Sequence, residues 1–278
     1  MDEDFTRLAE SEYSYHALES RLHPKASPEM LLDFDNNGYV LLRCCVCADL
    51  FWSALNQREV GSLVDAFKGC DDYWSNQFAL KDNKGRLYHQ SQWLEPGNDI
   101  LGAAGRNAKL AGVAEQLLNR GEIYMYSGKM LMKSPNTGGA LLWHQDYGYW
   151  YNNLAPYPDF VTCIIALTRS NPENGGLEVI KGSQRCGRID HKKQHGQTCA
   201  DLDRVDRILT KLPLVQVRLE PGDAVLFHGN MLHRSGPNDS DQERWHLIFS
   251  YNTKENSPHQ PHYNAQYNPL GAPAPSSQ

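Results

Sequence analysis

From about residue 123 onward, the spacing of apolar residues changes from that of helices to that of strands. Short apolar runs such as "IYMYSGKMLMK" (123–133), "VTCIIALT" (161–168) and "LEVIKGS" (177–183) follow one another, separated by segments that contain glycine and proline. Runs of this length between turn residues are typical of β-strands. The second half of the chain is therefore expected to be mainly β.

"LVQVRLEPGDAVLFH" (214–228) shows the strand pattern most clearly. Side chains alternate along a strand, so Val215, Val217 and Leu219 share one face and the polar residues between them share the other. The composition of residues 220–223 predicts a turn before the next strand. Many short strands joined in this way predict a β-sandwich or, more specifically, a double-stranded β-helix, the jelly roll of cupin-like proteins.

Helical spacing dominates before residue 123. Ser27 is placed to cap a helix that begins at Pro28, and "DNNG" ends this helix before a short strand, "YVLLR". Two further amphipathic helices are expected, over residues 47–69 and 106–119. We therefore expect α-helices to flank the jelly roll.

The 278 residues suit one large domain, because β-barrels and sandwiches often reach this size as single units. We expect this domain to cover residues 27–255, with a helical flank (27–122) and a jelly-roll core (123–252). Residues 1–26 have the composition of a polar lead-in, and residues 256–278 that of a C-terminal tail. A polar insert at residues 190–211 is predicted to be mainly helical and to serve as a lid or a dimer contact.

The composition excludes several classes of protein. A net charge of −6 argues against nucleic-acid binding, and the apolar runs are too short to span a bilayer. The acidic N-terminus contains no apolar stretch typical of a secretory signal. Seven irregularly spaced cysteines predict a reduced, cytoplasmic protein. The cluster of Cys44, Cys45 and Cys47 has no second ligand pair nearby, so we interpret it as small apolar residues that follow a strand.

His144 and Asp146 lie within the apolar and aromatic run "LLWHQDYGYW" (141–150). Residues two apart in an extended segment point the same way, so an imidazole and a carboxylate would meet at one point. On its own, such a pair is more typical of buried structural polar residues. A third ligand would complete a two-histidine, one-carboxylate face, which suits Fe(II) because three octahedral positions stay open. A closed four-ligand zinc site would leave no room for substrate and oxygen together.

"DAVLFHGNMLHRSGPNDSDQERW" (223–245) contains two candidates for the third ligand. His228 ends one predicted strand, and His233 begins the next segment. Arg244 starts a further predicted strand, from which its side chain can reach back beside the metal. A guanidinium donates two parallel hydrogen bonds to a carboxylate. A metal, an open face and a buried arginine together predict a dicarboxylate cosubstrate.

The chain resembles the phytanoyl-CoA dioxygenase family of Fe(II)/2-oxoglutarate oxygenases, which includes the ectoine hydroxylases. The matching blocks run in family order over roughly residues 30–252: "KMLMKSP", "WHQDYGYW", "NGGLEVIKGSQR", "EPGDAVLFHGNMLHRSGPN" and "ERW". The resemblance implies that His144, Asp146 and His233 bind iron.

The resemblance also implies a cosubstrate site. Arg244 and Ser235 would bind the far carboxylate of 2-oxoglutarate. Met130 would line the cosubstrate pocket, with Lys133 close by, and a further contact would fall on Ile165.

The implied activity is hydroxylation of a small polar organic molecule with O2. 2-Oxoglutarate is converted to succinate and CO2 in the same reaction, and ascorbate is an expected stimulant. In halogenating relatives a small residue replaces the carboxylate ligand, so Asp146 favours hydroxylation. The expected partner is a small molecule, and the expected assembly is a monomer or a homodimer.

Three aromatic residues just beyond the first two ligands are candidates to contact the substrate: Tyr147, Tyr149 and Trp150. The resemblance places Trp150 where ectoine hydroxylases have a tryptophan. Ring faces and hydroxyls suit a small polar or cationic substrate, and ordinary core packing is the alternative. The sequence contains no basic cluster that would indicate a site for the phosphates of CoA.

Two other functions fit parts of the pattern: a metal-dependent cupin-type enzyme without 2-oxoglutarate, and a non-catalytic metal- or 2-oxoglutarate-binding protein. Of the remaining histidines, His246 shares a strand face with Arg244 and is expected to have a structural role. Those in polar stretches are expected to be solvated: His191, His195, His259 and His262.

Overall fold

The computed structural model describes residues 13, 15, 26–43, 54–194, 196–258 and 266–270. The cysteine cluster (Cys44, Cys45 and Cys47) and three of the histidines expected to be solvated lie outside these residues.

The first part of the described chain supplies helices and three strands. They are α2 (Pro28–Asn37), β1 (Tyr39–Leu42), α3 (Gln57–Lys68), α4 (Asp71–Ser75), β2 (Gln77–Lys81), β3 (Leu87–Trp93), α5 (Ile100–Gly105) and α6 (Ala108–Leu118). The Ser27 side chain accepts a hydrogen bond from the Met30 amide, Pro28 opens α2, and Gly38 ends it with φ at 83°. This φ favours glycine, so α2 begins and ends as predicted.

Two features of the flank differ from the sequence-based prediction. β2 and β3 lie in a region expected to be helical; β3 pairs with β4, and β2 follows it as the edge strand of the larger sheet. The helix expected over residues 106–119 begins at Ala108, because the Asn107 side chain accepts a hydrogen bond from the Lys109 amide and caps a new helix there.

The second part of the chain supplies most of the strands. The elements are β4 (Ile123–Lys133), β5 (Leu141–His144), α7 (Asp146–Trp150), η2 (Tyr151–Asn153), β6 (Phe160–Ala166), β7 (Leu177–Ile180), η3 (Ser183–Cys186), β8 (His191–Gln194), β9 (Gln197–Ala200), α8 (Leu202–Leu209), β10 (Leu214–Gln216), β11 (Ala224–His228), β12 (His233–Ser235), β13 (Arg244–Thr253) and η4 (Lys254–Asn256).

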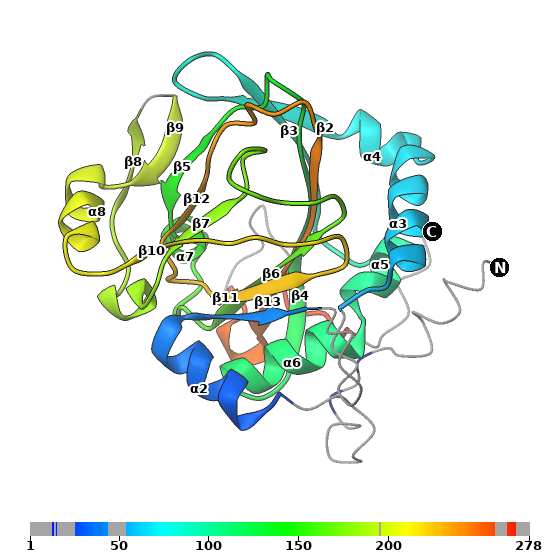
Figure 1. Cartoon of the computed structure of the whole chain (residues 1–278). Helices are drawn as coiled ribbons and strands as arrows, with labels where there is room; N and C mark the ends of the chain where they lie inside the picture. Colours follow the sequence, from blue (N-terminus) through cyan, green and yellow to red (C-terminus); the bar gives the residue numbers. More distant parts are fainter. Residues whose placement is uncertain are drawn as a thin grey trace.

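Two antiparallel sheets face each other (Figure 1). The larger has the order β1-β11-β6-β13-β4-β3-β2, and the smaller has the order β10-β7-β12-β5. The non-sequential neighbours show that the chain crosses repeatedly between the sheets. This arrangement is the predicted double-stranded β-helix.

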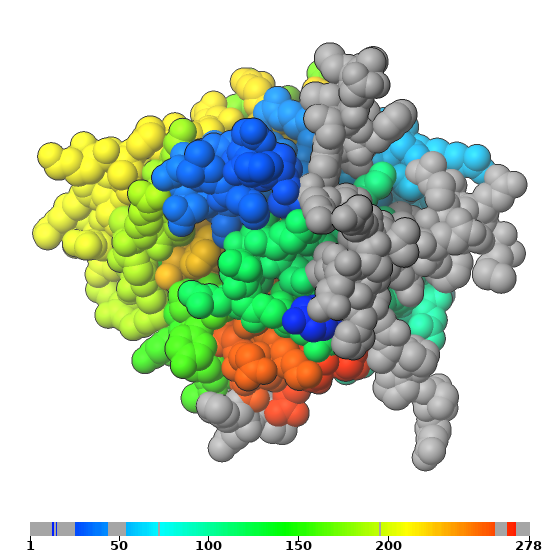
Figure 2. Space-filling model, turned by 90° about the horizontal axis from the view of Figure 1, so that it is seen from below, coloured from blue at the N-terminus to red at the C-terminus, as the bar shows by residue number. Residues whose placement is uncertain are grey.

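Each face of the larger sheet has its own apolar core, because side chains alternate along its strands. On β4, Met130 and Met132 pack toward the helical layer, whereas Leu131 packs between the two sheets. The helical layer includes α2 and α6, which lie side by side across this face in Figure 2. Burial of each large apolar side chain in these cores contributes about 1.5–3 kcal/mol.

The insert at residues 190–211 was predicted to be mainly helical, which is wrong for its first half. β8 and β9 form a two-stranded hairpin, and only Leu202–Leu209 is helical. Val205 and Ile208 of α8 pack against residues of the smaller sheet, including Trp143 and Ile180. Among the described residues, no helix combines the length and apolar character needed to cross a bilayer.

Candidate metal and cosubstrate site

His144, Asp146 and His233 come together at one end of the smaller sheet. His233 opens β12 and is the antiparallel partner of His144, the last residue of β5. Their ring centroids lie 4.0 Å apart. Gln145 is extended, with φ −115° and ψ 135°, and this turns Asp146 back toward His144. Asp146 itself begins the helix α7, so the extended segment is shorter than predicted.

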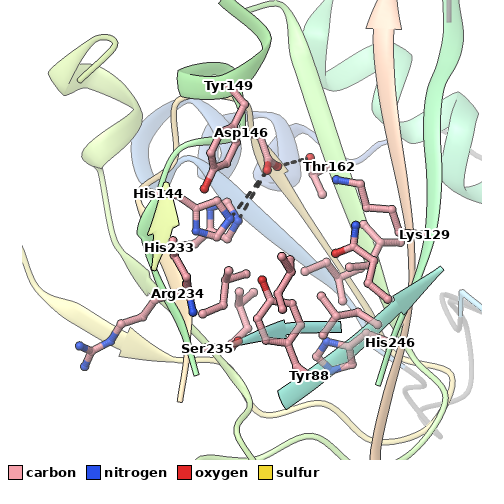
Figure 3. A pocket seen from close by; sticks show the side chains of 18 of the residues that line it. Tyr88, Lys129, His144, Asp146, Tyr149, Thr162, His233, Arg234, Ser235 and His246 are labelled. Atoms are coloured by element: carbon pink, nitrogen blue, oxygen red, sulfur yellow. Dashed lines mark hydrogen bonds and ion pairs between the residues drawn. The ribbon is translucent and has the colours of Figure 1, made fainter. Parts of the chain in front are cut away.

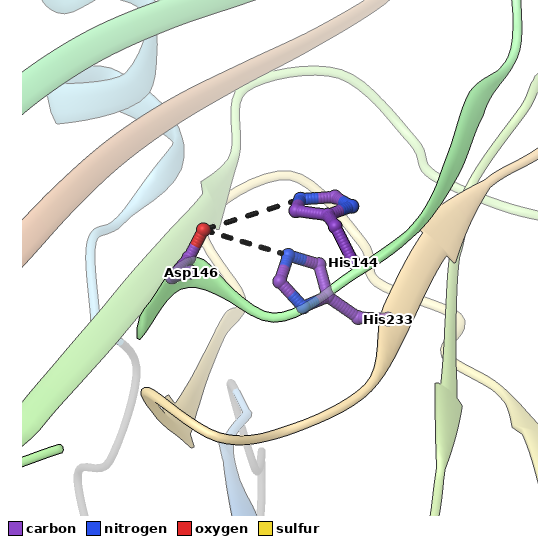
Figure 4. A group of neighbouring side chains, drawn as sticks. All are labelled: His144, Asp146 and His233. Atoms are coloured by element: carbon purple, nitrogen blue, oxygen red, sulfur yellow. Dashed lines mark ion pairs between the residues drawn. The ribbon is translucent and has the colours of Figure 1, made fainter. Parts of the chain in front are cut away.

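The ligand atoms of these three residues lie within 4.8 Å of one another, and they form the one such group among the described residues (Figure 4). Asp146 Oδ1 is 4.0 Å from His144 Nε2 and 3.9 Å from His233 Nε2. A divalent ion with bonds of about 2.0–2.2 Å bridges atoms up to about 4 Å apart. The donor set therefore fits a metal ion held on one face, with the remaining positions open.

Neighbouring groups hold each of these side chains in place. Nδ1 of His144 donates to the Leu142 carbonyl at 2.8 Å, and Nδ1 of His233 donates to the Met231 carbonyl at 3.0 Å. Each Nε2 is thus left as an acceptor that faces Asp146. Burial, and then the neighbouring His233, hold the pKa of His144 well below its usual value, so the ring is neutral, as a metal ligand must be.

Thr162 on β6 orients the carboxylate. Its hydroxyl donates to Asp146 Oδ2 at 2.6 Å. The other oxygen, Oδ1, faces the two imidazoles.

The structure places His228 outside this group. Its Nδ1 accepts a hydrogen bond from the Asn230 amide, and its ring lies 6.1 Å from that of Phe34. Burial lowers its pKa to about 4. Of the two candidates for the third ligand, only His233 lies with His144 and Asp146.

A cavity of about 370 Å³ opens between the two sheets beside the three residues (Figure 3). Its walls are largely apolar and include Leu131, Leu141, Ile164, Phe227 and Ile248. This volume is typical of a small-molecule site.

Arg244 lies in the wall of this cavity and is only 1% exposed. Nη1 contacts His246 Nδ1, while Nε and Nη2 have no hydrogen-bond partner among the residues that the structure describes. His246 Nε2 lies 2.9 Å from Ser170 Oγ, so a neutral ring that donates there presents Nδ1 to Arg244 as an acceptor. Burial lowers the pKa of Arg244 to about 9, which leaves the guanidinium charged at neutral pH.

Buried donors without partners are costly, and a carboxylate would satisfy both of them. The residues present therefore fit the far carboxylate of a dicarboxylate. His246, for which a structural role was expected, contacts Arg244 and orients its guanidinium.

Ser235 and Lys133 lie at the same end of the cavity. Arg244 is the cross-strand partner of Lys133, and Lys133 Nζ lies 2.7 Å from Ser235 Oγ. Because the ammonium donates to Ser235, the hydroxyl proton of Ser235 is free to point toward a bound anion. Burial, and then Arg244, hold the pKa of Lys133 well below its usual value.

Met130 does not line the cavity. It lies on the opposite face of β4, in the core between the sheet and the helices, as does Ile165 on β6. Lys129 and Leu131 line the cavity in its place. The expected pocket contact was therefore misplaced by one residue, which reverses the face of a strand.

Of the three aromatic candidates, only Tyr149 lines the cavity. Its hydroxyl donates to the Thr198 carbonyl in the β8–β9 hairpin at 2.6 Å. Tyr147 and Trp150 pack in a separate aromatic cluster with Tyr126 and Phe160. Residues 146–150 are helical, so the three aromatic candidates point in different directions from this turn.

His191, expected to be solvated, belongs to the surroundings of the site. Its Nε2 accepts a hydrogen bond from the Gln145 amide at 2.9 Å, and Tyr149 packs against its ring. The Gln145 side chain donates to the carbonyls of Gly187 and Asn230. Gln145, which lies between the ligands His144 and Asp146, thus connects them to the hairpin. Its position in an apolar and aromatic run did not reveal this role.

Comparison with known proteins decides the family. A model described as phytanoyl-CoA dioxygenase matches residues 34–269. The chain belongs to the phytanoyl-CoA dioxygenase family. The L-proline trans-4-hydroxylase of Streptomyces griseoviridis is 36% identical over 168 residues, which are 55% of this chain and 62% of that protein. The ectoine dioxygenase of Bordetella parapertussis is 29% identical over 177 residues, 59% of this chain and 57% of that one.

The chain thus spans less than two thirds of the length of these two family members. A longer match, 25% identical, joins 97% of the chain to 90% of the ectoine dioxygenase of Nocardia farcinica. A crystal structure of EctD from S. alaskensis with 2-oxoglutarate and 5-hydroxyectoine has a TM-score of 0.65 at 22% identity, covering 96% of this chain and 86% of that one. This likeness confirms the predicted fold.

Proposed function

We propose that the protein is an Fe(II)- and 2-oxoglutarate-dependent dioxygenase that hydroxylates a small organic molecule and converts 2-oxoglutarate to succinate and CO2. One observation carries the proposal: two imidazoles and a carboxylate meet in the same cavity as a buried arginine with two unpartnered donors. The names of the relatives, a proline hydroxylase and ectoine dioxygenases, support it.

His144, Asp146 and His233 would hold the iron, which when bound supplies the site for activating O2. Arg244 and Ser235 would bind the far carboxylate of 2-oxoglutarate and so fix its distance from these ligands. The largely apolar walls exclude water, which strengthens the charge-assisted bonds to Arg244. Tyr149 and the β8–β9 hairpin close one side of the cavity, where the substrate would be positioned.

The test is to load the protein with Fe(II) and 2-oxoglutarate without oxygen, then admit O2 with a panel of small metabolites and measure succinate. We expect O2-dependent succinate release that one or more metabolites stimulate. Iron binding without succinate would favour a cupin-type enzyme that does not use 2-oxoglutarate. Binding of both ligands without O2 uptake would favour a sensor.

Replacement of the ligands tests the metal site directly. Asp146→Ala and His233→Ala should each abolish tight Fe(II) binding and succinate formation, because two ligands remain where three are needed. His228→Gln is the matched control, because it removes a histidine that lies outside the group, and it should retain iron. An Asp146→Ala or His233→Ala variant with unimpaired turnover would remove that residue from the site.

A further inference from the structure

Lys129 is a basic side chain in the cavity wall, and the opposite charge that acts on it belongs to Asp146, a proposed iron ligand. Its ammonium makes no hydrogen bond or ion pair with any residue that the structure describes. The other cations near the cavity differ in this respect. Lys133 contacts Ser235 and the Gly236 carbonyl, and Arg234 pairs with Glu178 at 2.5 Å.

The strand geometry places Lys129 away from the site proposed for the cosubstrate's far carboxylate. Lys129, Leu131 and Lys133 share one face of β4, and Lys133 pairs with Arg244 whereas Lys129 pairs with Ile248. Four residues of strand separate Lys129 from Lys133 by about 13 Å. Figure 3 shows the ammonium of Lys129 directed toward Thr162 and Asp146, at the metal end of the cavity.

The remaining lining offers no partner for this charge. The single carboxylate among the lining residues is Asp146, which the proposed function assigns to iron. Lys129 is half-buried, and an ammonium that is partly removed from water without a counter-charge of its own is unfavourable. A bound anion at this position would therefore gain from a charge that is already in place. A single unpaired cation beside a small cavity is suited to a small ligand that carries one negative charge.

We propose that the hydroxylated substrate is a small carboxylic acid and that Lys129 binds its carboxylate at the metal end of the cavity. This inference rests on the proposed function and adds the substrate class to it. Of the small polar and cationic substrates expected from the sequence, it favours a polar anion over a cation, because Tyr147 and Trp150 lie outside the cavity and Lys129 lines it. A molecule with several phosphates would need more cations than this end of the cavity provides.

The test compares acids with their own amides. Wild type, Lys129→Met and Lys129→Arg are loaded with Fe(II) and 2-oxoglutarate without oxygen. Binding of L-proline and L-prolinamide, and of other small carboxylic acids each beside its carboxamide, is then measured by calorimetry. Lys129→Met keeps all but the terminal atom of the side chain's length and removes the charge, whereas Lys129→Arg keeps the charge. Lys211→Met removes an exposed lysine that does not line the cavity.

We expect wild type to bind at least one acid about 10- to 100-fold more tightly than its amide. Lys129→Met should reduce this preference to within about 3-fold and leave the affinity for 2-oxoglutarate in place, while Lys129→Arg and Lys211→Met retain the preference. Retained 2-oxoglutarate binding also shows that Lys129→Met is folded.

Three results would overturn the inference: no acid in the panel binds, the preference survives in Lys129→Met, or this variant loses affinity for 2-oxoglutarate instead. Each of these leaves the proposed function standing as long as wild type binds iron and 2-oxoglutarate. If wild type fails to bind those two, the proposed function itself is wrong.

Discussion

Arg244 does two things that a lysine could not do at the same position. It contacts His246 through one nitrogen and keeps two further donors for a ligand. A lysine ammonium is a single, more strongly hydrated point charge, and it cannot form the parallel pair of bonds that a carboxylate accepts from a guanidinium.

Arg244→Lys should therefore raise the KM for 2-oxoglutarate by about 10- to 100-fold, because roughly one charge-assisted hydrogen bond is lost. Fe(II) affinity should change little, since the three ligands are untouched. Steady-state succinate release at varied 2-oxoglutarate measures the effect. The control is Arg218→Lys at an exposed side chain, which should match wild type. An unchanged KM in Arg244→Lys would remove this residue from the cosubstrate site.

At the level of single residues, the sequence predicted which residues belong to the site more reliably than it predicted the face of the strand on which each side chain lies. The spacing of His144 and Asp146 made them candidates, and the family resemblance, not the residue type, selected His233 over His228. Met130 was misplaced because a strand alternates its faces, so an error of one position exchanges cavity and core. Lys129 was overlooked for the same reason, although it lies on the same face as Lys133.

The β8–β9 hairpin is the element whose position beside the site was hardest to predict, because contacts between residues far apart in the sequence hold it there. It reaches the site through His191, whose ring lies against Gly148 in α7, and through Thr198, which contacts Tyr149. Only the fold shows that residues some 45 positions apart touch. The prediction of a helix here relied on polar composition, which does not distinguish a short exposed hairpin from a helix.

Gly148→Ala should displace this hairpin. A Cβ at this position would lie 2.0 Å from His191 Cε1, so the ring must move and its bond to the Gln145 amide must lengthen or break. Overpacking of this kind costs about 1–3 kcal/mol. Hydrogen exchange measured by mass spectrometry should become faster in β8 and β9 than in wild type.

Gly61→Ala is the matched control, because a Cβ there meets nothing within 4 Å and the residue lies within α3. It should stabilise the protein by about 0.5–1 kcal/mol and leave exchange in the hairpin unchanged. Equal exchange rates in Gly148→Ala and wild type would show that the hairpin tolerates the added methyl group.

On the scale of the whole molecule, the fold buries histidines that stay neutral at acidic pH values at which exposed histidines are protonated. Burial lowers the pKa of His228 to about 4, and burial followed by Arg244 holds the pKa of His246 well below its usual value. The unfolded chain protonates such groups near pH 6.5, so between about pH 4 and 6.5 it binds protons that the folded chain does not. This contribution to stability is present above pH 6.5 and is lost as the pH falls.

Glu115 acts in the opposite direction. Burial raises its pKa to about 7, above its unfolded value of 4.5, and the Tyr13 hydroxyl contacts its carboxylate. The folded chain therefore holds a proton here that the unfolded chain releases. The resulting stabilisation is complete below about pH 4.5 and is lost as the pH rises through 7.

The histidines outnumber this glutamate, so the metal-free protein should unfold at a lower temperature at pH 5 than at pH 7. His228 alone contributes up to about 1.4 kcal/mol per pH unit within its window, and for a chain of this size 1 kcal/mol shifts the midpoint by about 2–4 °C. His228→Gln, which keeps an acceptor for the Asn230 amide, should flatten the pH dependence of the midpoint. Glu115→Gln should steepen it, because the opposing contribution disappears. Calorimetric scans of the three proteins across this range decide the point, and a midpoint that depends on pH identically in all three would mean that neither group is linked to folding.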